Sequence, residues 1–131
     1  MKKLLLVLPL LLVTGLARAG DITGIVVQAN DGRVQLEHAL KLASNMHEVL
    51  PKAKFEVVVF GPTVKLLKAF SPVAPLIHRV ANEGIKVIAC GRSLKTDKVP
   101  ASSLAFDVEV VPFGAVHIME REHHGWEYFR P

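Results

Sequence analysis

The sequence predicts an α/β domain in which a mainly parallel sheet of about five strands lies between two layers of helices. Short runs rich in β-branched residues alternate with segments of helical periodicity along the chain. One of these runs, residues 55–60, has almost no polar side, which is typical of a strand covered on both faces. This alternation favours right-handed βαβ crossovers and therefore a three-layer α/β/α sandwich.

Residues 1–19 have the pattern of a cleaved secretory signal. Residues 1–3 form a positively charged N-terminal region, and residues 4–13 form an apolar region. Ala17 and Ala19 are small residues at the positions that a signal peptidase recognises. The apolar run is shorter than the roughly 20 residues that span a bilayer. We therefore expect cleavage after Ala19 and an exported, periplasmic protein that has no membrane contact after cleavage.

The mature domain, residues 20–131, has a net charge close to zero. The whole chain has 16 Lys+Arg and 12 Asp+Glu, but three basic residues lie in the predicted signal, which leaves 13 against 12. The basicity of the whole chain therefore gives no support for nucleic acid as a partner. A domain of this length can bury a core without disulfides. Cys90 is the only cysteine, so it cannot form a disulfide within the chain.

The first half of the chain predicts two strands and one clearly amphipathic helix. A strand covers residues 21–29, and Asn30 or Asp31 caps the helix that follows. The residues expected to face inward from this helix are Leu36, Ala39, Leu40, Ala43, Met46 and Leu50. Ser44 belongs to the polar face. Residues 55–60 then form the second strand.

The second half predicts shorter elements. In order, these are helical segments at 63–70 and 72–82, a strand at 85–89, a polar loop at 91–100, a turn or single helical turn at 101–106, a strand at 107–111, a helix at 113–122 and a strand at 126–129. Ser71 is the expected N-cap of the 72–82 helix, and Gly84 closes it with a left-handed residue. Val116 and Met119 are expected to face inward from the last helix, with Ile118 as a further candidate.

Several segments, taken in order, resemble the DsrE/DsrF-like family of small sulfur-metabolism proteins. They are Asn30-Asp31-Gly32, residues 55–62 ending in Gly-Pro, Lys65-Leu66-Leu67, Ser71-Pro72-Val73, residues 85–91, residues 108–112 and residues 126–131. The resemblance covers essentially all of residues 21–131 and depends on the order and spacing of these segments. It implies a parallel five-stranded α/β/α fold, assembly into trimers or hexamers, and a cysteine at the end of the third strand that receives or passes sulfur as a persulfide. By motif match, that role falls on Cys90.

Cys90 is therefore the predicted catalytic residue. The carboxyl end of a buried strand is where ligands collect in α/β proteins. A sulfur carrier needs a thiolate, which nearby cations and helix N-termini favour; Arg92 is the nearest cation, and a helical turn from Ser93 would direct amides at the sulfur. Asn30 and Asp31 end the first strand on the same edge. With Arg92, they are candidate substrate-binding residues, while the sulfur donor and acceptor stay unidentified.

Other interpretations remain open for these residues. Cys90 is also compatible with a structural role in a non-catalytic oligomeric or interaction protein, since cysteine behaves as a small apolar residue when buried. Asn30 and Asp31 are common turn formers and helix caps. The aromatic strand at 126–129 either covers a sheet edge within one subunit or joins subunits of a homo-oligomer.

The sequence predicts no metal and no cofactor. His117, His123 and His124 lie six and seven residues apart, which places them too far apart along a straight helix for easy joint ligation. This spacing favours solvent-exposed histidines, and metal handling, including a site shared with Cys90, is left as the weaker alternative. The chain has no Gly-rich phosphate fingerprint, no Cys-x-x-Cys pair and no Gly-x-Ser-x-Gly nucleophile elbow, which disfavours nucleotide, dithiol and serine-hydrolase chemistry.

Overall fold

Five strands form one sheet in the computed structural model, which describes residue 3 and residues 21–131. The strands are β1 (Gly24–Ala29), β2 (Lys54–Val59), β3 (Lys86–Cys90), β4 (Val108–Val111) and β5 (Glu127–Phe129). Their order is β4-β3-β2-β1-β5, and every neighbouring pair is parallel. The predicted fold class is confirmed. The predicted signal at 1–19 lies outside the described residues, apart from Lys3.

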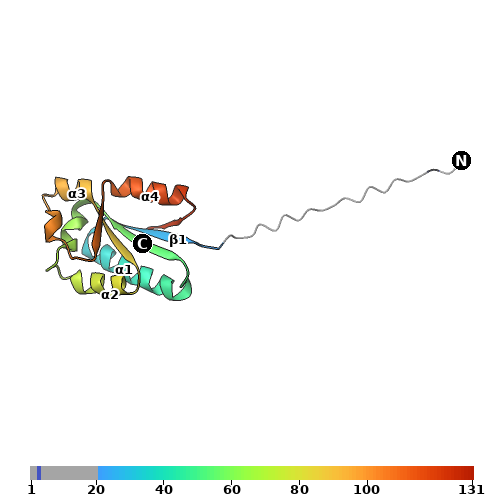
Figure 1. Cartoon of the computed structure of the whole chain (residues 1–131), viewed down its shortest axis with the longest axis horizontal. Coiled ribbons are helices and arrows are strands. Elements are labelled where there is room, and N and C mark those ends of the chain that lie inside the picture. Colours follow the sequence, from blue (N-terminus) through green and yellow to red (C-terminus); the bar gives the residue numbers. More distant parts are fainter. Residues whose placement is uncertain (1–2, 4–20) are drawn as a thin grey trace.

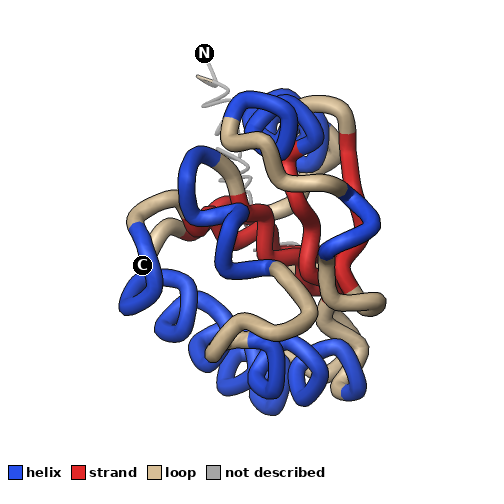
Figure 2. Tube along the Cα trace, turned by 90° about the vertical axis from the view of Figure 1, so that its left-hand side faces the viewer, coloured by secondary structure: helices blue, strands red, loops and turns tan. Residues whose placement is uncertain are grey.

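The helices form a layer on each side of the sheet. They are α1 (Gly32–Val49), α2 (Ala74–Asn82), α3 (Gly91–Thr96) and α4 (Gly114–His123), with 3₁₀ segments η1 (Gly61–Leu67) and η2 (Ala101–Ser103). Helices α1 and α2 cover one face and α4 lies over the other (Figure 1). Figure 2, turned by 90° from Figure 1, shows the strands in red between the helices in blue. No helix within the described residues combines the length and apolar character needed to cross a membrane.

The two faces of the sheet have cores of very different size. Alternate strand residues point to opposite faces. On the α1 and α2 side, a large cluster includes Phe55, Val57 and Val59 from β2 together with Leu36 and Leu40 from α1. On the other side, the buried apolar residues are Val26, Val58, Ile88 and, from α4, Ile118. The apolar core between α4 and the sheet is therefore small, and other interactions are needed to hold α4 in place.

Glu56 provides such an interaction, which the sequence analysis missed. This strand residue is 2% exposed and points toward α4. Arg121 donates to its carboxylate from Nε (3.0 Å) and Nη2 (2.7 Å), and His117 Nε2 lies 2.6 Å from Oε2. Pairing with Glu56 raises the pKa of Arg121 above its usual value. A buried carboxylate is tolerated only when it is paired in this way, so the cluster ties α4 to β2.

The same cluster explains two wrong predictions about α4. Val116 and Met119, expected to face inward, are 41% and 59% exposed. The residues of α4 that face the sheet are Gly114, His117, Ile118 and Arg121, which lie at helical spacing. The ionic cluster around Glu56 therefore decides which side of α4 faces the sheet, although the apolar pattern of the helix predicts another side. The prediction of exposed histidines is wrong for His117, whose side chain is 14% exposed, whereas His123 and His124 are exposed.

Two predictions near α2 are also wrong. Ser44 does not face solvent, because it donates to Glu83 Oε2 (2.5 Å) across the contact between α1 and the end of α2. Ser71 is not the N-cap, since α2 begins at Ala74 with Val73 in the capping position. The Ser71 hydroxyl instead donates to a carbonyl of η1 and accepts from the Val73 amide (3.1 Å). Serine is used here to shape the turn before the helix.

Candidate functional site

Cys90 ends the inner strand β3 and begins the next helix. Its sulfur accepts a hydrogen bond from the Ser93 amide (3.4 Å), which places Cys90 at the N-cap of α3. The predicted loop at 91–100 therefore begins as a helix, and the expected helical turn at Ser93 is confirmed. Gly91 fits here because an added Cβ would lie 3.0 Å from the carbonyl oxygen of Val111. The local backbone thus turns closely around the thiol.

The first residue of α4 also contacts Cys90. A Cβ on Gly114 would lie 3.0 Å from Cys90 Cβ and 3.3 Å from Val58 Cγ1, which is tighter than ordinary van der Waals contact. Glycine thus allows the start of α4 to lie directly against the thiol, where the Gly114 amide helps to lower the pKa of Cys90. Amides at the start of two helices, α3 and α4, therefore converge on one sulfur atom.

These donors change the acidity of the thiol. Burial raises the pKa of Cys90, but hydrogen bonds from the Ser93 hydroxyl and from the amides of Gly114, Ser93 and Arg92 outweigh it, so the pKa lies below its usual value. The Gly61 amide donates to Ser93 Oγ (2.8 Å), which leaves the hydroxyl hydrogen free to point at the sulfur. The thiolate, which is the nucleophilic form, is thus favoured.

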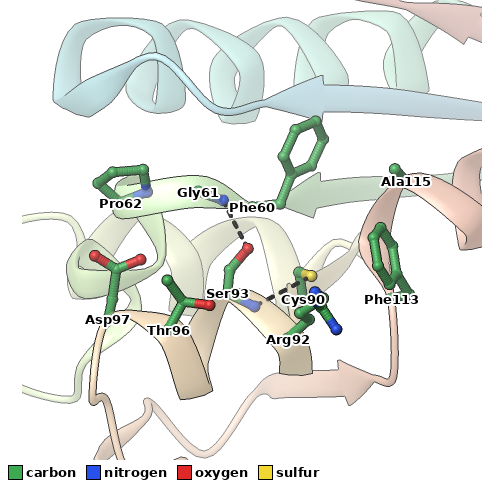
Figure 3. Close-up of a pocket in the computed structure, with 10 residues that line it drawn as sticks. All are labelled: Phe60, Gly61, Pro62, Cys90, Arg92, Ser93, Thr96, Asp97, Phe113 and Ala115. Atoms are coloured by element: carbon green, nitrogen blue, oxygen red, sulfur yellow. Dashed lines mark hydrogen bonds between the residues drawn. The ribbon is translucent and has the colours of Figure 1, made fainter.

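An open hollow of about 450 Å³ lies above the sulfur (Figure 3). Its lining residues are Phe60, Gly61, Pro62, Cys90, Arg92, Ser93, Thr96, Asp97, Phe113 and Ala115. Apolar side chains line much of this wall, and the Arg92 guanidinium lies 5.7 Å from the Phe113 ring centroid. Cys90 as a residue is only 2% exposed, so its sulfur is at the floor of the hollow. A volume of this size admits a small molecule or one extended side chain.

The structure brings together some of the predicted site residues and separates others. Arg92 lines the hollow with Cys90. Asn30 and Asp31 lie at the same edge of the sheet but outside the lining, where Gln35 Oε1 accepts from their amides (3.0 and 2.7 Å). Asp31 occupies the N-cap position of α1, yet its side chain makes no capping hydrogen bond. The long side chain of Gln35 satisfies these amides instead.

Sequence reasoning missed Gly114 and the two phenylalanines of the hollow. Phe60 follows β2, and Phe113 and Gly114 follow β4, the strands on either side of β3. Because carboxyl ends of neighbouring parallel strands meet at one edge, residues that follow these strands lie beside Cys90. Finding these residues from the sequence requires the order of the strands in the sheet, which the sequence pattern did not provide. Within the described residues, no group of three or more His, Cys, Asp or Glu side chains is placed to hold a metal ion.

This geometry defines a class of protein. Its members are all-parallel three-layer α/β domains with one cysteine in a hollow at the carboxyl edge of the sheet. No protein-family model matches the chain, and no curated protein does. Similar folds occur among solved structures. A protein of unknown function from Methanobacterium thermoautotrophicum, MTH1491, is 24% identical with a TM-score of 0.79, covering 83% of this chain and 99% of its own.

Two further solved structures share the fold. The ychN protein from E. coli is 15% identical with a TM-score of 0.71, covering 84% of this chain and 100% of its own. BT1422, a conserved protein of unknown function from Bacteroides thetaiotaomicron, is 16% identical with a TM-score of 0.68, covering 82% and 94%. These similarities show the fold, and the fold fits that of the DsrE-like family.

The rate of alkylation of Cys90 by iodoacetamide is predicted to follow a thiolate that forms at lower pH than that of free cysteine. Ser93→Ala removes the hydroxyl donor, so the midpoint of the pH–rate profile moves upward while the helix cap from the backbone amide stays in place. The measurement is a series of second-order rates against pH, with Thr23→Ala, which removes an exposed hydroxyl at the opposite edge of the sheet, as the control that leaves the midpoint unchanged. A wild-type midpoint at or above that of free cysteine would contradict the description of the site.

Proposed function

We propose that this protein is a sulfur carrier of the DsrE/DsrF-like type that holds sulfur as a persulfide on Cys90. The observation that supports the proposal most is the convergence of hydrogen-bond donors from α3, α4 and Ser93 on one thiol at the floor of an open hollow. A thiolate stabilised in this way is a competent nucleophile. The resemblance in the order and spacing of the segments described above, and the shared fold, agree with this role.

The transfer step needs no oxidant. The Cys90 thiolate attacks the terminal sulfur of a donor persulfide, R–S–SH, and forms a new S–S bond as the bond between the two donor sulfurs breaks. The donor leaves as a thiolate, and its former persulfide proton stays with Cys90–S–SH or passes to solvent. Transfer to an acceptor thiolate is the same reaction in reverse, with Cys90 as the leaving group.

The site groups have separate roles in this step. The amides of Gly114 and Ser93 stabilise negative charge on sulfur, both in the resting thiolate and when Cys90 leaves. Arg92 adds a positive charge at the wall of the hollow, where an anionic persulfide would lie. Export of the mature domain to the periplasm is part of the proposal. The contrasting function is that of an interaction protein in which Cys90 is structural.

Incubation of the mature protein with a low-molecular-weight persulfide is predicted to add the mass of one sulfur atom. Intact-mass spectrometry detects the adduct, which a reducing agent removes and which is absent from Cys90→Ser. Lys52→Glu, remote from the hollow, serves as the control that loads normally. Failure of the wild-type protein to gain sulfur from this donor, although Cys90 is alkylated readily, would favour the structural role.

We further propose that the protein forms a homo-oligomer through the outer side of α4. Val116 and Met119 lie three residues apart on this side and are 41% and 59% exposed. Exposed apolar residues on the outer side of a helix are typical of a surface covered by another subunit.

Met119→Glu is predicted to shift the protein to a smaller species in analytical ultracentrifugation. The charge would be buried without a partner in the proposed interface, whereas it is well solvated in a monomer because Met119 is 59% exposed there. Val34→Glu is the matched control, since Val34 is an 83% exposed apolar residue on α1. A wild-type protein that sediments as a monomer at high concentration would overturn the proposal.

A further inference from the structure

A second hollow adjoins the thiol site on the side of η1 and η2. It has a volume of about 450 Å³, and its lining residues are Lys65, Leu66, Lys68, Ala69, Phe70, Ser71, Pro72, Ser102 and Ser103. Lys65 Nζ lies 3.5 Å from Oδ1 of Asp97, a residue that lines the thiol hollow. This ion pair therefore forms the boundary between the two hollows, and a molecule large enough to fill the second reaches the edge of the first.

The backbone around the second hollow is held in place. Lys68 and Leu104 form an antiparallel bridge. The Ala69 amide donates to the Ser103 carbonyl (3.0 Å), and the Ala105 amide donates to the Leu67 carbonyl (2.9 Å). These bonds join η1 to the segment after η2, so the surface is formed before any partner arrives.

Charge is distributed unevenly with respect to this surface. Residues 60–71 and 90–106, which form most of the walls of both hollows and the turns beside them, contain five basic residues and one acidic residue. The rest of 21–131 contains eight basic and eleven acidic residues. The acidic residue in the first set, Asp97, is paired with Lys65. The segments beside the two hollows thus carry an excess of positive charge in a domain that is almost neutral as a whole.

Phe70 adds an apolar contact beside these charges. Its exposed fraction is 102%, and it lines the second hollow together with Lys65 and Lys68. A fully exposed aromatic side chain with basic neighbours is typical of a protein interface, where it would bury apolar area while the surrounding charges select the partner. A small donor molecule bound above Cys90 would gain nothing from it.

We propose that the face formed by Lys65, Lys68 and Phe70 docks an acidic protein partner whose thiol then reaches Cys90 through the adjoining hollow. The proposal rests on the sulfur-carrier function, for which it supplies the kind of partner. Opposite charges steer the encounter and set its orientation, and the fixed backbone of the second hollow gives the partner a defined place to bind. The partner, as donor or acceptor, needs a carboxylate-rich surface around its reactive cysteine.

Two synthetic peptides with one cysteine each test this proposal. One carries aspartates around the cysteine, the other carries lysines at the same positions, and both are activated as 2-pyridyl disulfides. The Cys90 thiolate attacks the peptide sulfur, forms a mixed disulfide and releases pyridine-2-thione, whose absorbance gives the rate. Rates are divided by that for neutral 2,2′-dithiodipyridine, so that changes in thiol acidity cancel.

At low salt, the acidic peptide is expected to react at least about tenfold faster than the basic one, as is usual for electrostatically steered association. The difference should shrink as salt approaches 1 M, where charges are screened beyond about 3 Å. Lys68→Glu should sharply reduce the preference, and Phe70→Ser should slow the acidic peptide. Lys52→Glu, with the same change per site at a distant turn, should change little.

Equal rates for the two peptides, or equal losses in Lys52→Glu, would overturn the docking face. Tighter binding of a single-stranded oligonucleotide than of the acidic peptide at these lysines would overturn it also, in favour of nucleic acid. The sulfur-loading experiment is independent of this test. A charge preference with no persulfide on Cys90 would reject the carrier function alone, whereas loading without charge preference would reject the docking face alone.

Discussion

The contact between Gly114 and Cys90 is the constraint on which the site depends. Only a residue without a side chain allows the start of α4 to come this close to the end of β3. The same contact places Phe113 and Ala115 on the wall of the hollow. Without this contact, the sulfur of Cys90 would interact with the amides of α3 alone. Its surroundings would be mainly apolar, and an apolar environment raises rather than lowers the pKa of a thiol.

The Glu56 cluster holds the other end of α4. The apolar core beneath this helix is small, so the position of α4 depends strongly on the bonds from His117 and Arg121 to Glu56. Removing one partner of such a buried pair typically costs about 3–5 kcal/mol, although a full apolar replacement can be neutral. A charged anchor therefore adds little net stability over an apolar one. What it fixes is the rotation of α4, which directs Gly114 inward and the apolar stripe outward.

The general architecture was predictable because it follows from local patterns. Buried strands rich in β-branched residues, the α1 stripe and the left-handed Gly84 all appear as expected. The position of Cys90 at the carboxyl end of the third strand followed from the same pattern. The expected helical turn at Ser93 also follows from residues adjacent in sequence, and the structure shows it as α3.

The wrong predictions involve contacts between residues far apart in sequence. Glu56 is the single charged residue in the otherwise apolar run 55–60, and the sequence does not indicate its partners because they lie 61 and 65 residues away. Because the anchor overrides the apolar pattern of α4, Val116 and Met119 face outward instead of inward. Asn30 and Asp31 are at the right edge of the sheet, but β1 lies beyond β2 from β3 in the strand order, and this separates them from the thiol.

The most direct test is a titration of the Cys90 thiolate by its ultraviolet absorbance in the wild-type protein and in Gly114→Ala. The added methyl group would lie 3.0 Å from Cys90 Cβ, so the start of α4 must shift by a few tenths of an ångström relative to the thiol, which weakens the interaction of its amide with the sulfur. We predict that the pKa of Cys90 rises toward that of a free thiol in the variant, while the fold is retained. An unchanged titration midpoint in a folded Gly114→Ala protein would contradict the claim that α4 controls the thiol.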